Sequence, residues 1–199
     1  MKFENAKFEA AFGKASQLPK SDLPEIVFTG KSNVGKSSLI NKIFNRKALA
    51  KVSSTPGKTA TVNFYNMGEA RLVDLPGYGY AKVSMSERER WSKLMDGYFA
   101  GERNIPLVVQ LVDMRHPPTK LDCDMMNFLK TVELPFVVAF TKCDKLNKTE
   151  RTKRLASIES ELDFLGFTPE IIPVSSSNGE GIETLKDFIK DCVKNEDAE

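Results

Sequence analysis

Cysteine and long apolar runs are scarce in this chain of 199 residues, and each scarcity excludes a class of protein. Its three cysteines, Cys123, Cys143 and Cys192, are widely separated and lack the paired spacing of a metal site, so we expect reduced thiols in a cytoplasmic protein. No apolar run approaches the ~18–20 residues that a membrane span needs. The first ten residues mix charged and apolar side chains, which is not the apolar core of a secretory signal. We therefore expect neither a membrane segment nor export.

The charge is unevenly distributed, although the formal net charge is only +2. Residues 1–60 contain eleven Lys and Arg against four Asp and Glu, whereas residues 61–199 contain eighteen against twenty-three. This split favours a polyanionic partner near the N-terminal portion. The alternative is that Lys36 and its neighbours only balance bound phosphates, and the other cations are solvated.

Strand and helix patterns alternate after a polar leader, residues 1–24. Continuous apolar runs such as 106–114 and 135–140 are typical of buried parallel strands, and helical spacings of apolar residues lie between them. Segments 62–67 and 70–75 flank Gly68 and predict a hairpin, so strand 62–67 should run antiparallel. The pattern predicts an α/β fold in three layers: a mostly parallel six-stranded sheet with one antiparallel strand and helices on both faces. We expect an N-terminal extension (1–24), one domain with this sheet (25–195) and an acidic tail (196–199).

The stretch "GKSNVGKSS", Gly30 to Ser38, follows a short apolar strand and precedes a helix expected over 36–46. It satisfies Gly-x4-Gly-Lys-Ser, in which backbone amides and a helix N-terminus surround phosphates. Lys36 can reach the β- and γ-phosphates, and the Ser37 hydroxyl can bind Mg²⁺. ATPases, kinases and GTPases share this pattern, so the motif alone does not identify the nucleotide.

Motifs at two further strand ends indicate which nucleotide the site binds. In "LVDLPG", Asp74 suits a carboxylate that orients Mg²⁺ through water, and Gly77 lets a backbone N–H approach the γ-phosphate. In "FTKCD", Asp144 offers two acceptor oxygens to the two donors on one edge of guanine, whereas adenine would leave the carboxylate unpaired. The stem of Lys142 can lie across the base. These motifs together predict that the bound nucleotide is GTP and that residues 25–195 are a G domain of the P-loop NTPase type.

Two loops complete the expected site. In "VSSSN", the amides of Ser175, Ser176 and Ser177 can contact the guanine carbonyl, although three serines are also typical of a plain loop. Residues 47–61 form a long loop near the phosphates, as a nucleotide-sensing switch requires. Thr55 and Thr59 are both candidate Mg²⁺ ligands in it.

The sequence resembles the TrmE–Era–EngA–EngB–Septin-like GTPases, and most closely the EngB family of ribosome-biogenesis GTPases. The segments that carry the resemblance are "GKSNVGKSSLIN", "SSTPGKTATVNFY", "LVDLPGYGYAKV", "LVDMRHPPT", "FTKCDK" and "VSSSNGEGI". They span about residues 25–193, and "DLPGYGYA" is distinctive. The resemblance implies that Thr59 is the second Mg²⁺ ligand beside Ser37. It also implies a role in assembly of the large ribosomal subunit, with consequences for cell division and septation.

The expected site is then as follows. We assign catalytic roles to Lys36, Thr59 and Gly77 and metal binding to Ser37 and Thr59. The residues expected to hold GTP or GDP with Mg²⁺ are Gly30, Lys31, Ser32, Asn33, Val34, Gly35, Lys36, Ser37, Ser38, Gly57, Lys58, Thr59, Asp74, Leu75, Pro76, Gly77, Thr141, Lys142, Cys143, Asp144, Ser175, Ser176 and Ser177. Asn33 matches the asparagine with which several related GTPases hold K⁺, so K⁺ is a candidate cofactor.

One departure from Ras-like enzymes concerns catalysis. They place a glutamine after the Asp-x-x-Gly glycine to orient the attacking water, and here Tyr78 stands in that place. A phenol is a poor substitute, so another group or a partner must supply this element. His116, the single histidine, and Arg115 follow a predicted strand and are alternatives, although a lone His before Pro-Pro is more often structural.

The sequence thus predicts a weak GTPase that acts as a nucleotide switch. The expected partner is the large ribosomal subunit or its precursor, through rRNA and ribosomal proteins, with no DNA or membrane partner and a monomeric protein. A nucleotide-gated binding module whose hydrolysis is incidental is the second hypothesis, which Tyr78 supports. A small-molecule kinase is a third, but "TKCD" and "DLPG" favour a GTPase.

Overall fold

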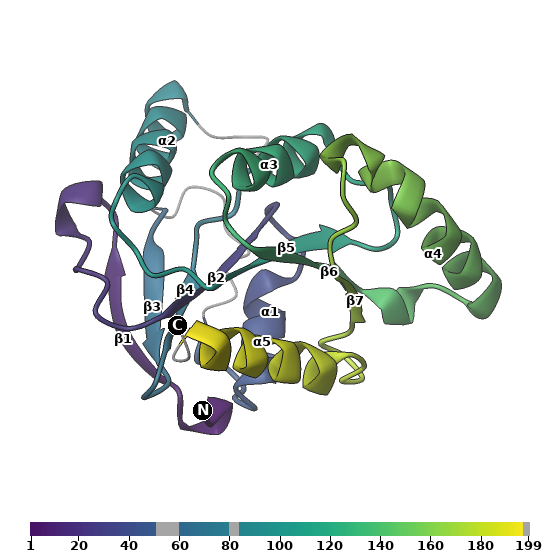
Figure 1. Ribbon diagram of the computed structural model, residues 1–199, viewed down its shortest axis with the longest axis horizontal. Helices are drawn as coiled ribbons and strands as arrows, with labels where there is room; N and C mark the ends of the chain where they lie inside the picture. The colour runs from purple at the N-terminus through teal and green to yellow at the C-terminus, as the bar shows by residue number, and fades with distance from the viewer. Residues whose placement is uncertain (51–59, 80–83, 197–199) are drawn as a thin grey trace.

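The computed structural model describes residues 1–50, 60–79 and 84–196 (Figure 1). Its strands are β1 (Lys7–Phe12), β2 (Glu25–Gly30), β3 (Val62–Asn66), β4 (Arg71–Asp74), β5 (Leu107–Asp113), β6 (Phe136–Thr141) and β7 (Ile171–Val174). The α-helices are α1 (Lys36–Ile43), α2 (Met85–Phe99), α3 (Lys120–Thr131), α4 (Lys148–Leu162) and α5 (Ile182–Glu196). Four 3₁₀ turns accompany them: η1 (Phe3–Asn5), η2 (Ala15–Gln17), η3 (Cys143–Lys145) and η4 (Asp163–Leu165).

The strands form one sheet in the order β1-β3-β4-β2-β5-β6-β7. β4, β2, β5, β6 and β7 are parallel neighbours. β3 is antiparallel to both β1 and β4, so among the described strands it is the one that runs against the others. The predicted α/β class, the hairpin 62–67 with 70–75 and the single antiparallel strand are confirmed. Because β2 lies in the middle, the loop that follows it is placed between strand ends on both sides.

The predicted count of six strands was wrong, because the leader contributes β1 and the sheet has seven strands. β1 pairs with β3 at the sheet edge and is interrupted by a register shift between Phe8 and Ala10. Its residues are mostly exposed, including Phe8 at 51%. A strand with so little burial carries a weak apolar alternation, which explains why the sequence pattern did not reveal it.

Ion pairs attach this leader to β4. Arg71, which is buried, donates from Nε and Nη2 to the two carboxylate oxygens of Glu9 on β1 over 2.8 and 2.9 Å. It also pairs with Asp22. A bidentate contact of this kind fixes both side chains geometrically as well as electrostatically.

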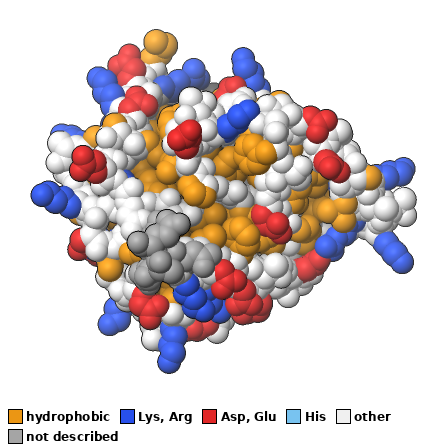
Figure 2. Space-filling model, viewed as in Figure 1, with side chains coloured by type: hydrophobic (Ala, Val, Ile, Leu, Met, Phe, Trp, Pro, Cys, Tyr) orange, Lys and Arg blue, Asp and Glu red, His pale blue; other side chains and the backbone are white. Residues whose placement is uncertain are grey.

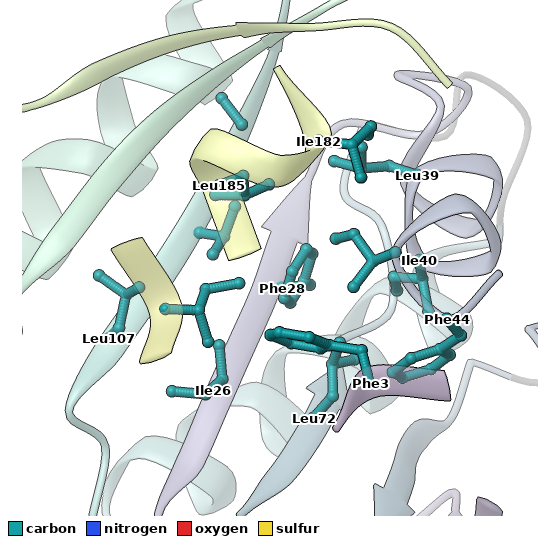
Figure 3. Packing of buried hydrophobic residues seen from close by; sticks show 14 of the residues in the cluster. Phe3, Ile26, Phe28, Leu39, Ile40, Phe44, Leu72, Leu107, Ile182 and Leu185 are labelled. Carbon is teal, nitrogen blue, oxygen red and sulfur yellow. The ribbon is translucent and has the colours of Figure 1, made fainter. Parts of the chain in front are cut away.

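Helices cover both faces of the sheet, with α2, α3 and α4 on one face and α1 and α5 on the other (Figure 1). Side chains of β2 alternate between the two layers: Ile26 and Phe28 belong to the cluster with α1 and α5, and Val27 to the cluster with α2. Figure 3 shows Phe28 between side chains of α1 and α5, with Phe3 of η1 below it. Burial of β2 on both faces holds the start of the following loop rigidly.

Capping boxes begin three of the helices. Ser84 with Glu87 caps α2, Thr119 with Asp122 caps α3, and Asn147 with Glu150 caps α4. In each pair the side chains satisfy otherwise unpaired backbone N–H groups. The helix expected over 36–46 is shorter and ends at Ile43, where Phe44 caps it and Asn45 takes a positive φ.

The surface in Figure 2 carries hydrophobic side chains in its middle, and Lys and Arg lie mostly around its outline. Among the described residues, large apolar side chains that are more than a third exposed include Phe128, Val132, Phe164 and Phe167. No helix within this described part is both long and apolar enough to cross a membrane.

Candidate nucleotide-binding site

The phosphate-binding loop connects β2 to α1. Asn33 and Gly35 both have positive φ, 65° and 104°, and Gly35 is the N-cap of α1. The Thr141 hydroxyl at the end of β6 donates to the Val34 carbonyl over 2.7 Å. This turn and its tie to β6 place the first amides of α1 at the carboxyl edge of the sheet, where they can bind an anion.

Lys36 and Asp74 are brought together by this loop and the end of β4. Their side chains form an ion pair, and both are largely buried, at 11% and 8% exposure. The Asn63 amide approaches the other oxygen of Asp74 at 3.5 Å. The two predicted phosphate and Mg²⁺ residues therefore lie at one point, beside half-buried Ser37 at the start of α1.

Gly77 lies directly against the phosphate-binding loop. A Cβ at Gly77 would stand 3.2 Å from the Ser32 nitrogen, so a larger residue would not fit without movement. Pro76 accepts a hydrogen bond of 3.1 Å from the indole of Trp91 on α2, and Leu75 donates from its backbone to Phe28. The segment after β4 is thus held between the loop and α2, as the predicted γ-phosphate contact requires.

Tyr78 does not occupy the place of a water-orienting side chain. Its ring is buried, and its hydroxyl donates to Asp122 and accepts from the Gln110 amide, both over 2.7 Å. Burial, together with the nearby Asp122 carboxylate, holds the pKa of the Tyr78 phenol far above its usual range. The phenol is therefore neutral. Because its partners are buried side chains of α3 and β5, it points into the core and not toward the phosphate end.

The residues expected to read the base lie at the ends of β6 and β7. The Ser175 hydroxyl donates to Asp144 over 2.7 Å, and Lys145 lies 3.4 Å from the other oxygen. The hydrogen bond from Ser175 is the main reason why the pKa of Asp144 is lowered. Asp144 is thus a fixed carboxylate with two acceptor oxygens at this edge of the sheet.

Lys142 connects the base end of the site to the phosphate end. It has a positive φ of 62°, and its ammonium donates to the Asn33 carbonyl and to Asp113, both over 2.9 Å. A Cβ at Gly35 would lie 3.9 Å from its Cε, so its aliphatic stem crosses above the loop. That this stem lies across a bound base stays a prediction.

Asp113 is a site residue that the sequence reasoning missed. It is the last residue of β5, accepts from Arg115 and Lys142, and so fixes the stem of Lys142. Burial raises its pKa, but the hydrogen bonds from Arg115 and Lys142 outweigh that effect and hold the pKa far below its usual range. Its position at the carboxyl end of a buried strand was the signal that could have revealed it.

The serine loop differs in detail from the expectation. The Ser175 N–H donates to the Glu180 carbonyl, and the Ser177 N–H donates to the Ser175 hydroxyl. These two amides are engaged inside the loop and do not point to a base, which corrects their predicted role. An amide contact from Ser176 stays a prediction.

The other predicted residues are placed as follows. Lys31 forms a parallel bridge with Tyr78, Ser38 is half-buried in α1, and Cys143 is buried beside Glu180, where burial raises the pKa of its thiol to about 11. Thr55, Gly57, Lys58 and Thr59 lie outside the described residues.

His116 and Arg115 lie at the base end of the site. Arg115 pairs with Asp113, and the His116 carbonyl accepts from Arg154 of α4. Both side chains are exposed. Their partners are thus at the α4 side of β5, not at the Lys36–Asp74 pair, so the geometry gives neither a role in orienting water.

The geometry agrees with the comparisons with known proteins. The family described as "50S ribosome-binding GTPase" matches residues 25–142. "Probable GTP-binding protein EngB" of Exiguobacterium sibiricum is 47% identical over 95% of this chain and 98% of its own, and that of Bacillus cereus strain G9842 is 44% identical over the full length of both. A crystal structure of "a probable GTP-binding protein engB" shares the fold, with a TM-score of 0.68 and 24% identity over 86% of this chain and 99% of its own. This chain belongs to the EngB family of GTP-binding proteins, a family of GTPases.

Proposed function

We propose that the protein is a switch that binds the large ribosomal subunit or its precursor in its GTP form and leaves it after slow, Mg²⁺-dependent hydrolysis. The observation that carries the proposal is the meeting of Lys36 with Asp74, and of Lys142 with Asn33 and Asp113, at one edge of the sheet. One end of this edge suits phosphates and the other suits a guanine. A triphosphate that bridges the two can stabilise the switch segments that flank them.

The residues at the phosphate end fit Mg²⁺. The Ser37 hydroxyl and the Asp74 carboxylate are oxygen ligands of the kind that this hard cation prefers, and the Lys36–Asp74 pair shows that both elements meet there. We propose that Ser37 and Thr59 hold the ion directly and that Asp74 orients it through water. Bound Mg²⁺ would neutralise charge on the β- and γ-phosphates. Lys36 and the loop amides hold the phosphate oxygens, and Gly77 supplies one N–H.

K⁺ is a second proposed cofactor. The Asn33 side chain is exposed in the phosphate-binding loop, and none of the hydrogen bonds within the described residues uses its amide. A monovalent cation there would add positive charge beside the phosphates. Equal hydrolysis rates in sodium and potassium salts would contradict this proposal.

Two observations support the ribosomal partner. The matching family is described as 50S ribosome-binding, and the first 60 residues carry the excess of Lys and Arg. The face shown in Figure 2 is apolar in its middle, so it is not the expected contact for a polyanion. We propose that the protein acts in the cytoplasm as a monomer and that its loss impairs large-subunit assembly and, through it, cell division and septation.

A nucleotide-gated binding module whose hydrolysis is incidental is the second candidate. The observation in its favour is Tyr78, whose buried phenol cannot orient water. Turnover measured with and without the ribosomal particle separates the two. A rate that the particle does not raise, at a level too slow for one assembly cycle, would favour the binding module.

A pelleting experiment tests the proposed function. Large-subunit particles from cells depleted of this protein are mixed with it in a GTP analogue or in GDP, at two salt concentrations. We expect co-sedimentation with the analogue, release with GDP, and weaker binding at the higher salt because phosphate contacts release counterions. Equal binding with both nucleotides would contradict the proposal that the nucleotide controls binding. No binding with either nucleotide would contradict the proposal that the large ribosomal subunit is the partner.

A further inference from the structure

The segment after β4 is paired with the phosphate-binding loop through the backbone of Tyr78. The Tyr78 N–H donates to the Gly30 carbonyl over 3.4 Å, and the Ser32 N–H donates to the Tyr78 carbonyl over 2.8 Å. The Ser32 hydroxyl donates to the same carbonyl over 2.9 Å. Both polar backbone groups of Tyr78 therefore face the loop, in strand-like pairing beyond the end of β2.

This pairing does not engage the Gly77 N–H. The backbone hydrogen bonds of this pairing use the N–H and the carbonyl of Tyr78 and neither backbone group of Gly77. Gly77 is buried, and no backbone hydrogen bond of its N–H occurs within the described residues. A buried donor in this position calls for an acceptor, which a phosphate oxygen can provide.

The Tyr78 side chain anchors the segment after β4 through hydrogen bonds to α3 and β5. Its hydroxyl is fully used, since it donates to Asp122 of α3 and accepts from Gln110 of β5. Asp122 is itself held by the Thr119 backbone and hydroxyl, so it is a rigid acceptor. The Gln110 Oε1 atom has no hydrogen-bond partner in the described part of the chain. The network therefore already contains one unsatisfied buried acceptor.

We propose that Tyr78 is a positioning residue: its buried hydroxyl holds Gly77 against the phosphate-binding loop and thereby presets the Gly77 N–H for the γ-phosphate. The inference rests on the proposed GTP switch and adds a group that favours the triphosphate over the diphosphate. GDP lacks the γ-phosphate, so the contact of the Gly77 N–H is available to GTP alone. Ordering this segment in advance lowers the entropic cost of triphosphate binding.

The test compares two buried tyrosines whose hydroxyls each donate to a buried carboxylate. Tyr98 is also buried, and its hydroxyl donates to the Glu25 carboxylate over 2.7 Å, at the opposite end of β2 from Gly30. Tyr78→Phe and Tyr98→Phe each remove one buried hydroxyl and leave one carboxylate short of a partner. Affinities for GDP and for a non-hydrolysable GTP analogue are measured for both variants and the wild type, together with their melting temperatures.

We expect Tyr78→Phe to lower the ratio of analogue to GDP affinity about tenfold, the order that loss of one hydrogen bond to a charged group produces. GDP affinity should stay at the wild-type value, and the effect on hydrolysis should appear in KM rather than in kcat. Ser32→Ala, which removes only the second donor to the Tyr78 carbonyl, should lower the ratio less. Tyr98→Phe should lower the melting temperature without changing the ratio.

An unchanged or raised ratio in Tyr78→Phe would overturn the inference, as would an equal fall in Tyr98→Phe. A wild-type protein that binds neither nucleotide would instead contradict the proposed function. The two failures are therefore distinguishable.

Discussion

The Ser175 hydroxyl donates a hydrogen bond of 2.7 Å to the Asp144 carboxylate, joining the ends of β6 and β7. The same Ser175 oxygen accepts from the backbone N–H groups of Ser177 and Asn178. One hydroxyl thus fixes both the carboxylate expected to read guanine and the loop beside it. The orientation of Asp144 is set before any base arrives.

Replacing Asp144 should change the base that the site accepts. Asp144→Asn substitutes a donor amide for one acceptor oxygen, so GTP affinity should fall at least about a hundredfold, and xanthosine triphosphate, whose C2 carbonyl can accept, should bind instead. Competition titrations with the two nucleotides and ATP measure this. Asp124→Asn, on the exposed side of α3, is the control and should retain the preference for GTP. Wild-type protein that binds ATP as well as GTP would show that the interpretation of "TKCD" is wrong.

Replacing Asp113 should weaken nucleotide binding without changing the preferred base. Asp113→Asn removes the charged partner of Lys142, whose stem is expected to cover the base, so affinities for GDP and GTP should fall together by about tenfold. The same variant tests the lowered pKa of the Asp113 carboxyl. A depressed carboxyl pKa stabilises the fold above the ordinary value of about 3.9, and that stability is lost as the pH falls toward the folded pKa.

The stability difference between wild type and Asp113→Asn should therefore be full near neutral pH and shrink below about pH 4. Chemical denaturation at a series of pH values measures it. A difference that is constant over this range would contradict the assignment of the lowered pKa to the ion pairs of Asp113.

Lys36→Ala should abolish triphosphate binding and also lower stability. It leaves the buried Asp74 carboxylate without its cation, and breaking a buried pair in this way typically costs about 3–5 kcal/mol. Calorimetric titration with GTP and thermal unfolding without nucleotide measure the two effects. Lys42→Ala, later in α1, should bind GTP as the wild type does. A Lys36→Ala protein of unchanged stability would mean that the pair with Asp74 contributes little to the fold.

Gly97→Ala should destabilise the protein, although alanine normally favours a helix over glycine by about 1 kcal/mol. A Cβ at Gly97 of α2 would stand 2.3 Å from the Ala15 Cβ of η2, so the leader would be forced off the helix. We expect a loss of about 1–3 kcal/mol. The double variant Ala15→Gly with Gly97→Ala removes the collision and should regain most of it. Equal stability of the single and double variants would show that this contact is not the cause.

The central part of the fold could be predicted because its signals are local and strong. β5 and β6 are continuous apolar runs, the hairpin of β3 and β4 flanks Gly68, and the phosphate-binding loop has a fixed spacing. The edge strand β1 could not be predicted, because its pairing with β3 depends on residues about fifty positions away and buries little apolar surface.

The candidate site, like the fold, could be predicted where the signal is a local sequence motif and not where it depends on tertiary contacts. Lys36, Asp74, Lys142 and Asp144 carry recognisable motifs, and the structure gathers them at one edge of the sheet. The roles of Asp113 and of the Tyr78 hydroxyl depend on which side chains meet across β5, α3 and β6, and sequence spacing does not contain that information. The internal bonds of the Ser175 loop are likewise a matter of tertiary geometry.

The place of β1 at the sheet edge has a consequence for the order of folding. During synthesis β1 emerges before the other described strands, but β3, the strand with which it pairs in the described residues, follows about fifty residues later. The central strand β2 gains its second neighbour only when β5 has emerged. β1 can therefore pair only after β3 has been synthesised, and this pairing carries the entropic cost of closing a long loop. Amide hydrogens of β1 should then exchange with solvent sooner than those of β2, because an outer strand can detach while the strands of the centre stay paired.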